Sequence, residues 1–380
     1  MIYLDNAATS FKKPFLVYPA ILINSVKNSA NAGRGGHFYS LRASAKIYET
    51  TESLCRLFNI PQPENICYTQ NATHALNIGI LGMLDDTSHV IITQMEHNSV
   101  LRPVNRLCKY TMVSANKKGQ INIADIEKSI RPDTKMIICT HISNVCGTVM
   151  PVEEISKIAK KHNIFFMLDA SQSAGNTPID VLALNVDLMA FSGHKGLMMP
   201  MGTGGLYVKE NTPIKPFITG GTGSYSAMLT QPDIMPDMLQ SGTLNAPAII
   251  SAKKSVDFII RHTPAAIGEK EKYLALKFIE KIKNMNNVEL LGLEDGDRGG
   301  TVAFNIKNCD SIYISEILND RFHICTRGGW HCAYPSHIAL GSEKTGAVRA
   351  SFGYFNNLRH VNKLADAVYS LSKKINGDIY

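Results

Sequence analysis

The sequence of 380 residues lacks several features that mark well-known classes of protein. It has no apolar run of about 18 residues or more, so we expect no membrane-spanning helix. Its first residues, MIYLDNAATS, do not place a charged stretch before an apolar one, and we expect no signal peptide. It has no basic stripe interleaved with aromatic residues, which disfavours nucleic acid as a partner. The net charge of +7 fits solubility and attraction of anionic ligands.

Paired cysteines are also missing. The eight cysteines show no CxxC spacing, and they do not form the even-numbered disulfide framework that is typical of a short secreted chain. This favours a reducing cytoplasm and mostly buried thiols. There is no internal repeat and no low-complexity linker. Hydrophobic residues make up 44% of the chain and charged residues 19%, a balance that argues against disorder. The cysteines are Cys55, Cys67, Cys108, Cys139, Cys146, Cys309, Cys325 and Cys332.

The middle of the chain alternates strand-like and helix-like segments. Met136–Ser143 is a short apolar run with β-branched residues, which predicts a strand. Pro151–Asn163 begins with proline and acids and ends with lysines, an order that predicts a helix. Ile164–Ser171 is again apolar, so the three segments predict a β-α-β unit. Similar strands are expected at His89–Glu96, Asp187–Lys195 and Gly204–Val208. The expected fold class is α/β, with a mostly parallel sheet covered by helices on both faces.

The pattern changes near residue 250, where a smaller α+β region is expected to begin. Long amphipathic helices are predicted at Ser251–His262 and around Glu269–Lys283. A strand at Thr301–Ile306, a helix at Ser311–Asn319, a loop at Arg327–His337, a strand at Ala347–Gly353 and a final helix follow.

Polar residues stand where the predicted strands end. Ligands on sheets of this kind bind at the carboxyl ends of the strands. Any one of these residues could be a cap or a turn residue, but together they come from four separate elements and predict a ligand site. They are His97, Asn144, Asp169, Ser192, His194 and Lys195.

The segment Ser192–Gly205, SGHKGLMMPMGTGG, is compatible with two chemistries. Its lysine precedes the glycines, so it does not have the spacing of a phosphate-binding Walker loop. The alternative is a lysine that forms a Schiff base with pyridoxal 5′-phosphate. That cofactor needs a lysine for the imine, a carboxylate for the pyridine nitrogen, donors for the phosphate and a flat group on the ring face.

The sequence contains a candidate for each of these needs. Lys195 can form the imine if the site keeps its amine unprotonated. Asp169 can hold the proton of the pyridine nitrogen, although an N-cap of the next helix is its alternative role. Thr73 lies in a turn of small residues leading into a helix, where backbone N–H groups can bind a phosphate. The other candidates are His97 for ring stacking, Ser192 and His194 for the phosphate, and Gln172 for the phenolic oxygen.

Cys332, in RGGWHCAYPSH, has three possible roles: a nucleophile, a metal ligand with His331 and His337, or a small buried residue. Adjacent His and Cys side chains do not easily face one ion, and no second ligand cluster is nearby, so we expect no metal. The surrounding glycines and proline indicate a loop and not a core strand. A thiolate nucleophile fits the cofactor chemistry, with His331 or Lys195 as a possible proton carrier.

Ten segments together resemble the cysteine desulfurase and selenocysteine lyase branch of the class V, fold-type-I pyridoxal phosphate enzymes. The resemblance runs from Tyr3 to about Asn357. Two departures, Met199 before Pro200 and the bulky Trp330 before the His-Cys pair, concern the pocket entrance and remove no catalytic group. The segments are YLDNAATS, NAGRGGH, TQNATHALN, MEHNSV, THISNVCGT, LDASQSAG, SGHK, SGTLN, RGGWHCAYPSH and VRASFGYFNN.

The resemblance implies a fold and a set of roles. It implies a large domain at 13–255 with a seven-stranded, mostly parallel sheet, and a small α+β domain at 256–380 onto which residues 1–12 fold back. It implies a Schiff base on Lys195, catalysis by Lys195, His97 and Cys332, and a homodimer in which Thr243 reaches the phosphate of the other subunit. The other implied residues are Ala72, Thr73, Asp169, Gln172, Ser192 and His194 for the cofactor, and Ala7, Asn144 and Arg349 for the substrate.

The expected reaction is the conversion of L-cysteine to L-alanine, with a persulfide on Cys332 that passes sulfur to an acceptor protein or pathway. Selenocysteine lyase activity on L-selenocysteine is one alternative. An aminotransferase or lyase of class V without persulfide chemistry is another, because a fold does not determine a reaction. Iron–sulfur, thiolated tRNA, thiamin and selenium pathways are all compatible acceptors.

Overall fold

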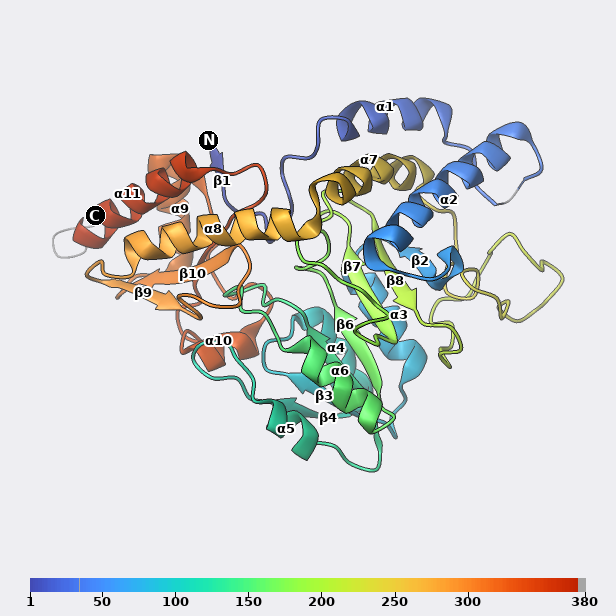
Figure 1. Cartoon of the computed structure of the whole chain (residues 1–380), viewed down its shortest axis with the longest axis horizontal. Coiled ribbons are helices and arrows are strands. Elements are labelled where there is room, and N and C mark those ends of the chain that lie inside the picture. The colour runs from blue at the N-terminus through green and yellow to red at the C-terminus, as the bar shows by residue number, and fades with distance from the viewer. Residues whose placement is uncertain (34, 375–380) are drawn as a thin grey trace.

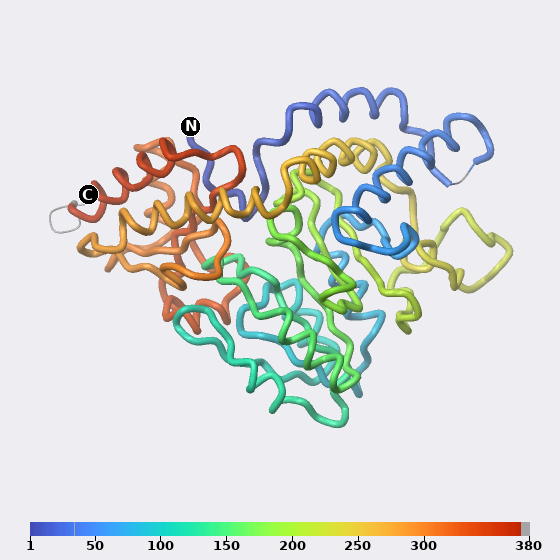
Figure 2. Tube along the Cα trace, viewed as in Figure 1, coloured from blue at the N-terminus to red at the C-terminus, as the bar shows by residue number. Residues whose placement is uncertain are grey.

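The computed structural model of the protein describes residues 1–33 and 35–374. Arg34, in the NAGRGGH segment, and residues 375–380, at the end of the expected small domain, lie outside the described residues. The chain is arranged around a large central sheet, and the N-terminus lies on the same side of the molecule as the C-terminal helices (Figures 1 and 2).

Seven strands of the described chain form the large sheet, in the order β2-β8-β7-β6-β5-β3-β4. β8 is antiparallel to both of its neighbours, and the other pairs run parallel. The predicted mostly parallel α/β sheet is therefore confirmed. The strands are β2 (Ile66–Thr69), β3 (His89–Thr93), β4 (Lys109–Val113), β5 (Thr134–Thr140), β6 (Phe165–Asp169), β7 (Leu188–Ser192) and β8 (Gly204–Val208).

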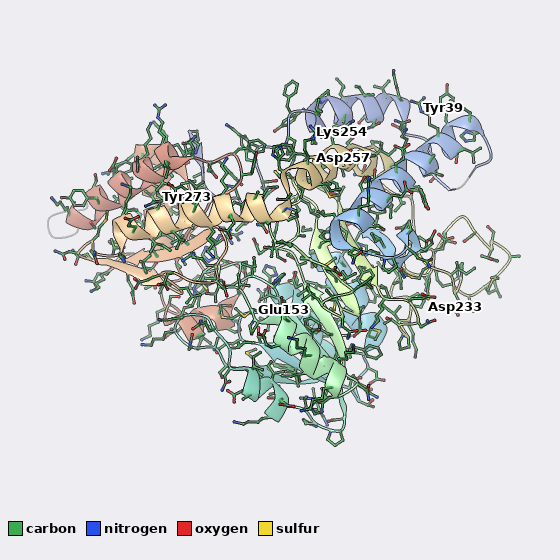
Figure 3. All side chains as sticks on the ribbon, in the orientation of Figure 1. Tyr39, Glu153, Asp233, Lys254, Asp257 and Tyr273 are labelled. Atoms are coloured by element: carbon green, nitrogen blue, oxygen red, sulfur yellow. The ribbon has the colours of Figure 1, made fainter. Side chains whose placement is uncertain are left out.

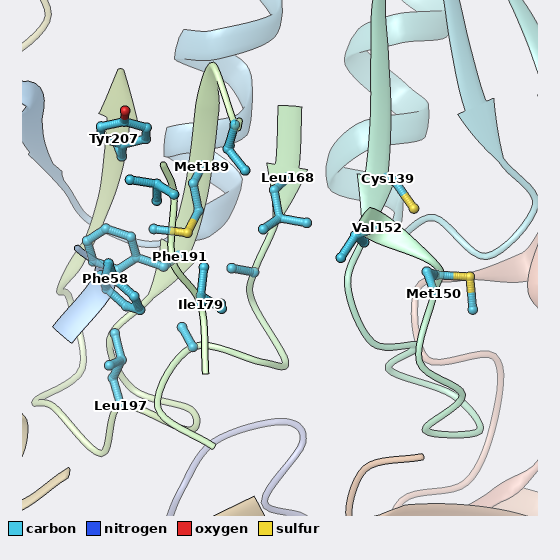
Figure 4. Packing of buried hydrophobic residues seen from close by; sticks show 14 of the residues in the cluster. Phe58, Cys139, Met150, Val152, Leu168, Ile179, Met189, Phe191, Leu197 and Tyr207 are labelled. Carbon is cyan, nitrogen blue, oxygen red and sulfur yellow. The ribbon is translucent and has the colours of Figure 1, made fainter. Parts of the chain in front are cut away.

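Alternate residues of these strands enter two cores, one on each face of the sheet. Phe166 and Leu168 of β6 lie in one core and Met167 lies in the other, because successive side chains of a strand point to opposite faces. In the first core, the ring centroids of Phe58 and Phe191 are 5.6 Å apart (Figure 4). The first core includes residues of α2 (Phe38–Phe58), α5 (Ile123–Lys128), α6 (Val152–Lys161) and α7 (Ala246–His262), and the second includes residues of α3 (Ala72–Met83) and α4 (Asn98–Leu107). Helix α1 (Val17–Lys27) packs on α7, and a short 3-10 turn, η1 (Pro63–Asn65), precedes β2.

The C-terminal part has a core of its own. Three strands form an antiparallel sheet in the order β12-β10-β9, and side chains from α8, α9 and α11 share its core. Leu4 joins this core and β1 pairs in parallel with β11, so the N-terminal residues lie with the C-terminal part. The elements are β1 (Ile2–Tyr3), α8 (Pro264–Ile282), β9 (Val288–Leu291), β10 (Thr301–Ile306), α9 (Ser311–Phe322), β11 (Ile324–Cys325), α10 (Tyr334–Leu340), β12 (Val348–Ser351) and α11 (Leu358–Lys374).

Two details differ from the sequence-based expectation. Helix α7 continues through position 255, and the chain direction changes at Thr263, whose φ is 59°. The expected loop at Arg327–His337 is partly helical, because α10 begins at Tyr334. The proline in the first turn of α10 is compatible with a helix, since the N–H that it lacks would have no partner within the helix. In the part of the chain that the structure describes, no helix has both the length and the apolar character needed to cross a bilayer.

Candidate active site

The predicted site residues meet where β5, β6 and β7 end. These strands are neighbours and run parallel, so Thr140, Asp169 and Ser192 lie along one edge of the sheet. A cavity of about 240 Å³ opens there. Its lining includes Ala72, Thr73, His97, Asn144, Asp169, Gln172, Ser192, His194 and Lys195.

Three other predicted residues lie beside this cavity. Ala7 lines a small cavity of about 50 Å³ that also reaches Gln172 and Lys195, and its carbonyl accepts a hydrogen bond from Gln172 Nε2 at 3.0 Å. Thr243 is exposed and lines a separate space of about 590 Å³ that shares His194 with the main cavity. Cys332 lies beside the cavity lining, because its carbonyl accepts a hydrogen bond from the N–H of Asn98, the residue after His97.

Lys195 is the centre of the site. Burial lowers the pKa of its amine to about 8, the Asp169 carboxylate raises it, and Arg349 and Arg327 lower it. A lysine with a lowered pKa carries an unprotonated, nucleophilic amine in a larger fraction of molecules near neutral pH. The sequence did not predict a site role for Arg327, although Arg327 is the first residue of the RGGWHCAYPSH segment.

Asp169 ends β6 and is buried. Its Oδ1 accepts hydrogen bonds from the backbone N–H of Ser171 at 2.9 Å and from the Ser171 hydroxyl. No α-helix follows within the next few residues, so the alternative role of Asp169 as a helix N-cap does not apply. A buried carboxylate at a strand end can instead serve a cation in the cavity.

A hydrogen-bonded chain connects His97, Ser99 and Thr73. His97 is the N-cap of α4, and its Nδ1 accepts from the Ser99 N–H at 3.0 Å. The Ser99 hydroxyl lies 2.9 Å from the same Nδ1 and 2.8 Å from the Thr73 hydroxyl. Burial, followed by the charge of Lys195, lowers the pKa of His97 to about 4, so a neutral, flat ring faces the cavity. Ser99 was missed from the sequence, and its only signal was its position two residues after His97 at a helix start.

Arg349 is buried and held in place by two groups. It donates to Asp5 Oδ1 at 2.7 Å and to the Asn144 carbonyl at 3.0 Å, while its Nε has no hydrogen-bond partner among the described residues. Arg349 is not part of a surface ion pair, because only 1% of the residue is exposed. Asn144 in turn donates from Nδ2 to the His331 carbonyl at 2.8 Å. The candidate substrate residues are therefore linked to the Cys332 segment.

Cys332 is exposed and has an unusual backbone. His331 and Cys332 have φ values of 51° and 56°, in the left-handed region where a side chain costs energy. The Cys332 carbonyl accepts from the Asn98 N–H at 2.7 Å, next to His97. The glycines before it predicted a loop, and these contacts attach that loop to the start of α4 and to Asn144.

Both histidines near Cys332 have engaged ring nitrogens. His331 contacts the Arg327 carbonyl through Nε2 at 3.2 Å and His337 through Nδ1 at 3.4 Å. His337 Nδ1 lies 2.8 Å from the Ser342 hydroxyl. His331 therefore has no ring nitrogen left for a metal ion or for the Cys332 proton. No group of three or more His, Cys, Asp or Glu residues suited to a metal occurs within residues 1–33 and 35–374.

The cavity has the properties that an anionic, flat cofactor requires. His194 Nδ1 is buried without a partner among the described residues, which suits a hydrogen bond to a phosphate group. The first turn of α3, at Ala72 and Thr73, directs backbone N–H groups and the positive end of a helix toward the same cavity. The donor set therefore fits pyridoxal 5′-phosphate.

Comparison with known proteins identifies the family of the chain. The sequence pattern of the family described as "Aminotransferase class-V" matches residues 2–364. The chain belongs to the class-V aminotransferase family. Members of the class-V family with cysteine desulfurase activity depend on pyridoxal phosphate, in agreement with the fit described above.

Two relatives and one solved structure place the chain within the cysteine desulfurase branch of the class-V family. A probable cysteine desulfurase of Methanothermobacter thermautotrophicus is 31% identical over 98% of this chain and 94% of the relative. A probable cysteine desulfurase of Pyrococcus abyssi is 32% identical over 99% and 95%. The solved cysteine desulfurase of Thermococcus onnurineus is 31% identical, with a TM-score of 0.90 over 98% of this chain and 94% of that one.

This class-V protein also contains a buried carboxyl group that the sequence did not reveal as special. Glu96 Oε1 accepts from the Thr93 hydroxyl at 2.6 Å and from the Thr140 N–H at 3.0 Å. Its Oε2 is buried with no partner among the described residues. The pKa of Glu96 is raised to about 8: burial is the largest cause, the hydrogen bonds from Thr93 and Thr140 act against it, and the charge of Asp169 acts with it.

We predict that Glu96→Gln makes stability less dependent on pH. Because the folded-state pKa is raised from 4.5 to about 8, the stability from neutral Glu96 is complete below the lower value and is lost as pH rises through the higher one. Glutamine copies the neutral acid, so the variant should be more stable than wild type at pH 8, by about 1–3 kcal/mol, and similar at pH 5. Thermal unfolding of both proteins at the two pH values measures this, and equal pH dependence would contradict it.

Proposed function

We propose that this protein is a cysteine desulfurase that converts L-cysteine to L-alanine and holds the sulfur as a persulfide on Cys332. The observation that carries the proposal is that the exposed Cys332 is attached through its carbonyl to Asn98, the residue next to His97, at the cavity that contains Lys195. An aminotransferase needs the lysine and the cavity but has no use for such a thiol.

The cofactor would be held by residues from four parts of the fold. Lys195 would form the Schiff base, Asp169 would pair with the pyridine nitrogen, and His97 would stack on the ring. Gln172 would contact the phenolic oxygen. The phosphate would bind to Ala72, Thr73, Ser192 and His194, with Thr243 of a second subunit. When bound, the cofactor withdraws electrons from the amino acid and so weakens bonds next to its α-carbon.

Arg349, Asn144 and Ala7 would orient the substrate. The Nε of Arg349 is buried with no hydrogen-bond partner in the described part of the chain, so the guanidinium can bind a carboxylate through parallel hydrogen bonds. The Asp5 contact fixes the direction of the guanidinium plane, so this long side chain is already ordered before a substrate binds.

We predict that Arg349→Lys raises the KM for L-cysteine by about 10- to 100-fold and leaves cofactor binding nearly unchanged. Lysine keeps the charge beside Asp5 but loses the paired donors that a carboxylate requires. Steady-state kinetics and the visible absorbance of the bound cofactor measure the two effects. A KM within twofold of wild type would exclude the role.

Cys332 would take the sulfur. Its thiolate bonds to the Sγ of the substrate while the Cβ–Sγ bond breaks, and the electron pair of that bond stays with the carbon that becomes the methyl group of alanine after protonation. The products are alanine and a Cys332 persulfide, so no external oxidant or reductant is needed for this step. An acceptor then removes the sulfur at the exposed segment.

We also propose a homodimer, a two-domain organisation and a reducing compartment. Large apolar residues are exposed along α1 and α2, among them Leu22, Val26 and Leu41, and Tyr39 lies toward the outer end of α2 (Figure 3). A surface of this kind suits a second subunit. The proposed domains are 13–255 and 256–380 with 1–12; the core that Leu4 shares with the C-terminal strands and helices supports the second, although α7 continues from the first domain to His262. All eight cysteines are free thiols, which suits the cytoplasm.

The test is the release of alanine and of sulfide or selenide from L-cysteine and L-selenocysteine, with and without a reductant. A desulfurase produces one alanine per cysteine, and sulfide appears only when a reductant cleaves the persulfide. Release from selenocysteine alone would favour a selenocysteine lyase. A keto acid in place of alanine would favour an aminotransferase.

A further inference from the structure

A buried chain of hydrogen bonds lies next to Cys332 and has no role in the function proposed above. It links Ser342, His337 and His331 to the Arg327 carbonyl. His331, His337 and Ser342 are all buried. The two imidazole rings are nearly parallel, with an interplanar angle of 19° and centroids 5.5 Å apart.

The direction of each hydrogen bond follows from the Arg327 carbonyl, which can only accept. His331 Nε2 must therefore carry the proton, which leaves Nδ1 of a neutral His331 as an acceptor. His337 Nε2 then donates to His331, and His337 Nδ1 accepts from the Ser342 hydroxyl. Burial lowers the pKa of His337 to about 4 and outweighs the opposite effect of the Trp330 carbonyl. Burial also lowers the pKa of His331. Both rings are neutral at pH 7, as this order requires.

The chain ends at the segment whose backbone is strained. His331 and Cys332 both have positive φ values, and such residues persist only where surrounding contacts hold them. The peptide carbonyls of this pair are held by Asn144 and Asn98, both in the large-sheet part of the protein. The His331 side chain is the third attachment, and His337 is the side chain that donates to it.

We propose that His337 is a positioning residue for Cys332: through His331 it holds the left-handed backbone that keeps the thiol facing the Lys195 site. The proposal rests on the persulfide function proposed above. His337 touches neither substrate nor cofactor in this arrangement. It acts by keeping the nucleophile within reach, where a displacement of about 1 Å can reduce a rate by roughly 100-fold.

The experiment compares His337→Leu with His337→Gln in the cofactor-loaded protein. Leucine fills much of the space of the ring but cannot donate, whereas the Gln amide can place an N–H near the position of His337 Nε2. We expect the Leu variant to lose about 10- to 100-fold in kcat for alanine formation, with KM and visible cofactor absorbance unchanged. The Gln variant should stay within about threefold of wild type. Rescue by Gln separates a donated hydrogen bond from mere space filling.

Hydrogen–deuterium exchange provides a readout that does not depend on activity. The Asn98 amide is protected by its hydrogen bond to the Cys332 carbonyl, so release of the segment should speed its exchange at least about tenfold in the Leu variant and not in the Gln variant. Unchanged kcat and unchanged exchange in the Leu variant would overturn the proposal, as would a Gln variant as impaired as Leu. Faster exchange with unchanged kcat would support His337 as the residue that holds the segment and would instead refute Cys332 as the reacting group.

Discussion

Replacing Cys332 by alanine should abolish sulfide release from L-cysteine, with a loss of at least about 100-fold, while the visible absorbance of the bound cofactor remains. The thiol is exposed and takes part in none of the hydrogen bonds that hold Asp169 or His97. Its removal therefore leaves the cofactor cavity intact and deletes only the atom that receives sulfur. Sulfide release in the presence of reductant, together with an absorbance spectrum of the same sample, measures both effects.

Cys309→Ala is a matched control, because Cys309 is another partly accessible thiol that packs against the C-terminal core. It should retain wild-type sulfide release. Selenide release from L-selenocysteine is not the decisive measurement, since selenium can leave without attack by a thiol. Full sulfide release from the Cys332→Ala protein would refute the persulfide assignment.

Replacing Lys195 by alanine should have an even larger effect, a loss of more than about 1000-fold in alanine formation. The buried amine is the group in the cavity whose pKa is lowered to about 8, so it is the one prepared to form an imine near neutral pH. Without it, the cofactor binds only through non-covalent contacts and should be removed by gel filtration. Absorbance of the protein fraction and alanine formation are the two measurements.

Lys195→Arg separates the charge of Lys195 from its nucleophilic amine. Arginine keeps a cation beside Asp169 but stays protonated and forms no imine. It should be as inactive as the alanine variant, although the fold is preserved. Activity within tenfold of wild type in either variant would show that Lys195 does not carry the cofactor.

Much of the candidate cofactor site could be predicted from the sequence, because its residues stand at the ends of strands and the starts of helices. Asp169 and Ser192 each follow an uninterrupted apolar run, and parallel strands bring their carboxyl ends to one edge of the sheet. Thr73 and His97 stand at helix starts with recognisable capping residues around them. Each of these features can be recognised from the residues that lie within about ten positions of it in the chain.

Other parts of the site could not be predicted, because they depend on contacts between distant segments. The Arg349–Asp5 ion pair joins residues 344 positions apart, and Asn144 reaches His331 across 187 positions. Nor does a strand pattern reveal direction, so the antiparallel β8 was not distinguished from its parallel neighbours. The raised pKa of Glu96 arises from burial, which the residue type alone would not suggest.

The sequence by itself determined the α/β alternation and the family, and it supplied the candidate cofactor residues and the candidate nucleophilic cysteine, because each depends on residue types at short spacings. Only the tertiary structure decided how that cysteine is held. The left-handed backbone at His331 and Cys332, the neutral pair of His331 and His337, and the attachment to Asn98 exist because packing against α4 and burial of both rings outweigh local preference.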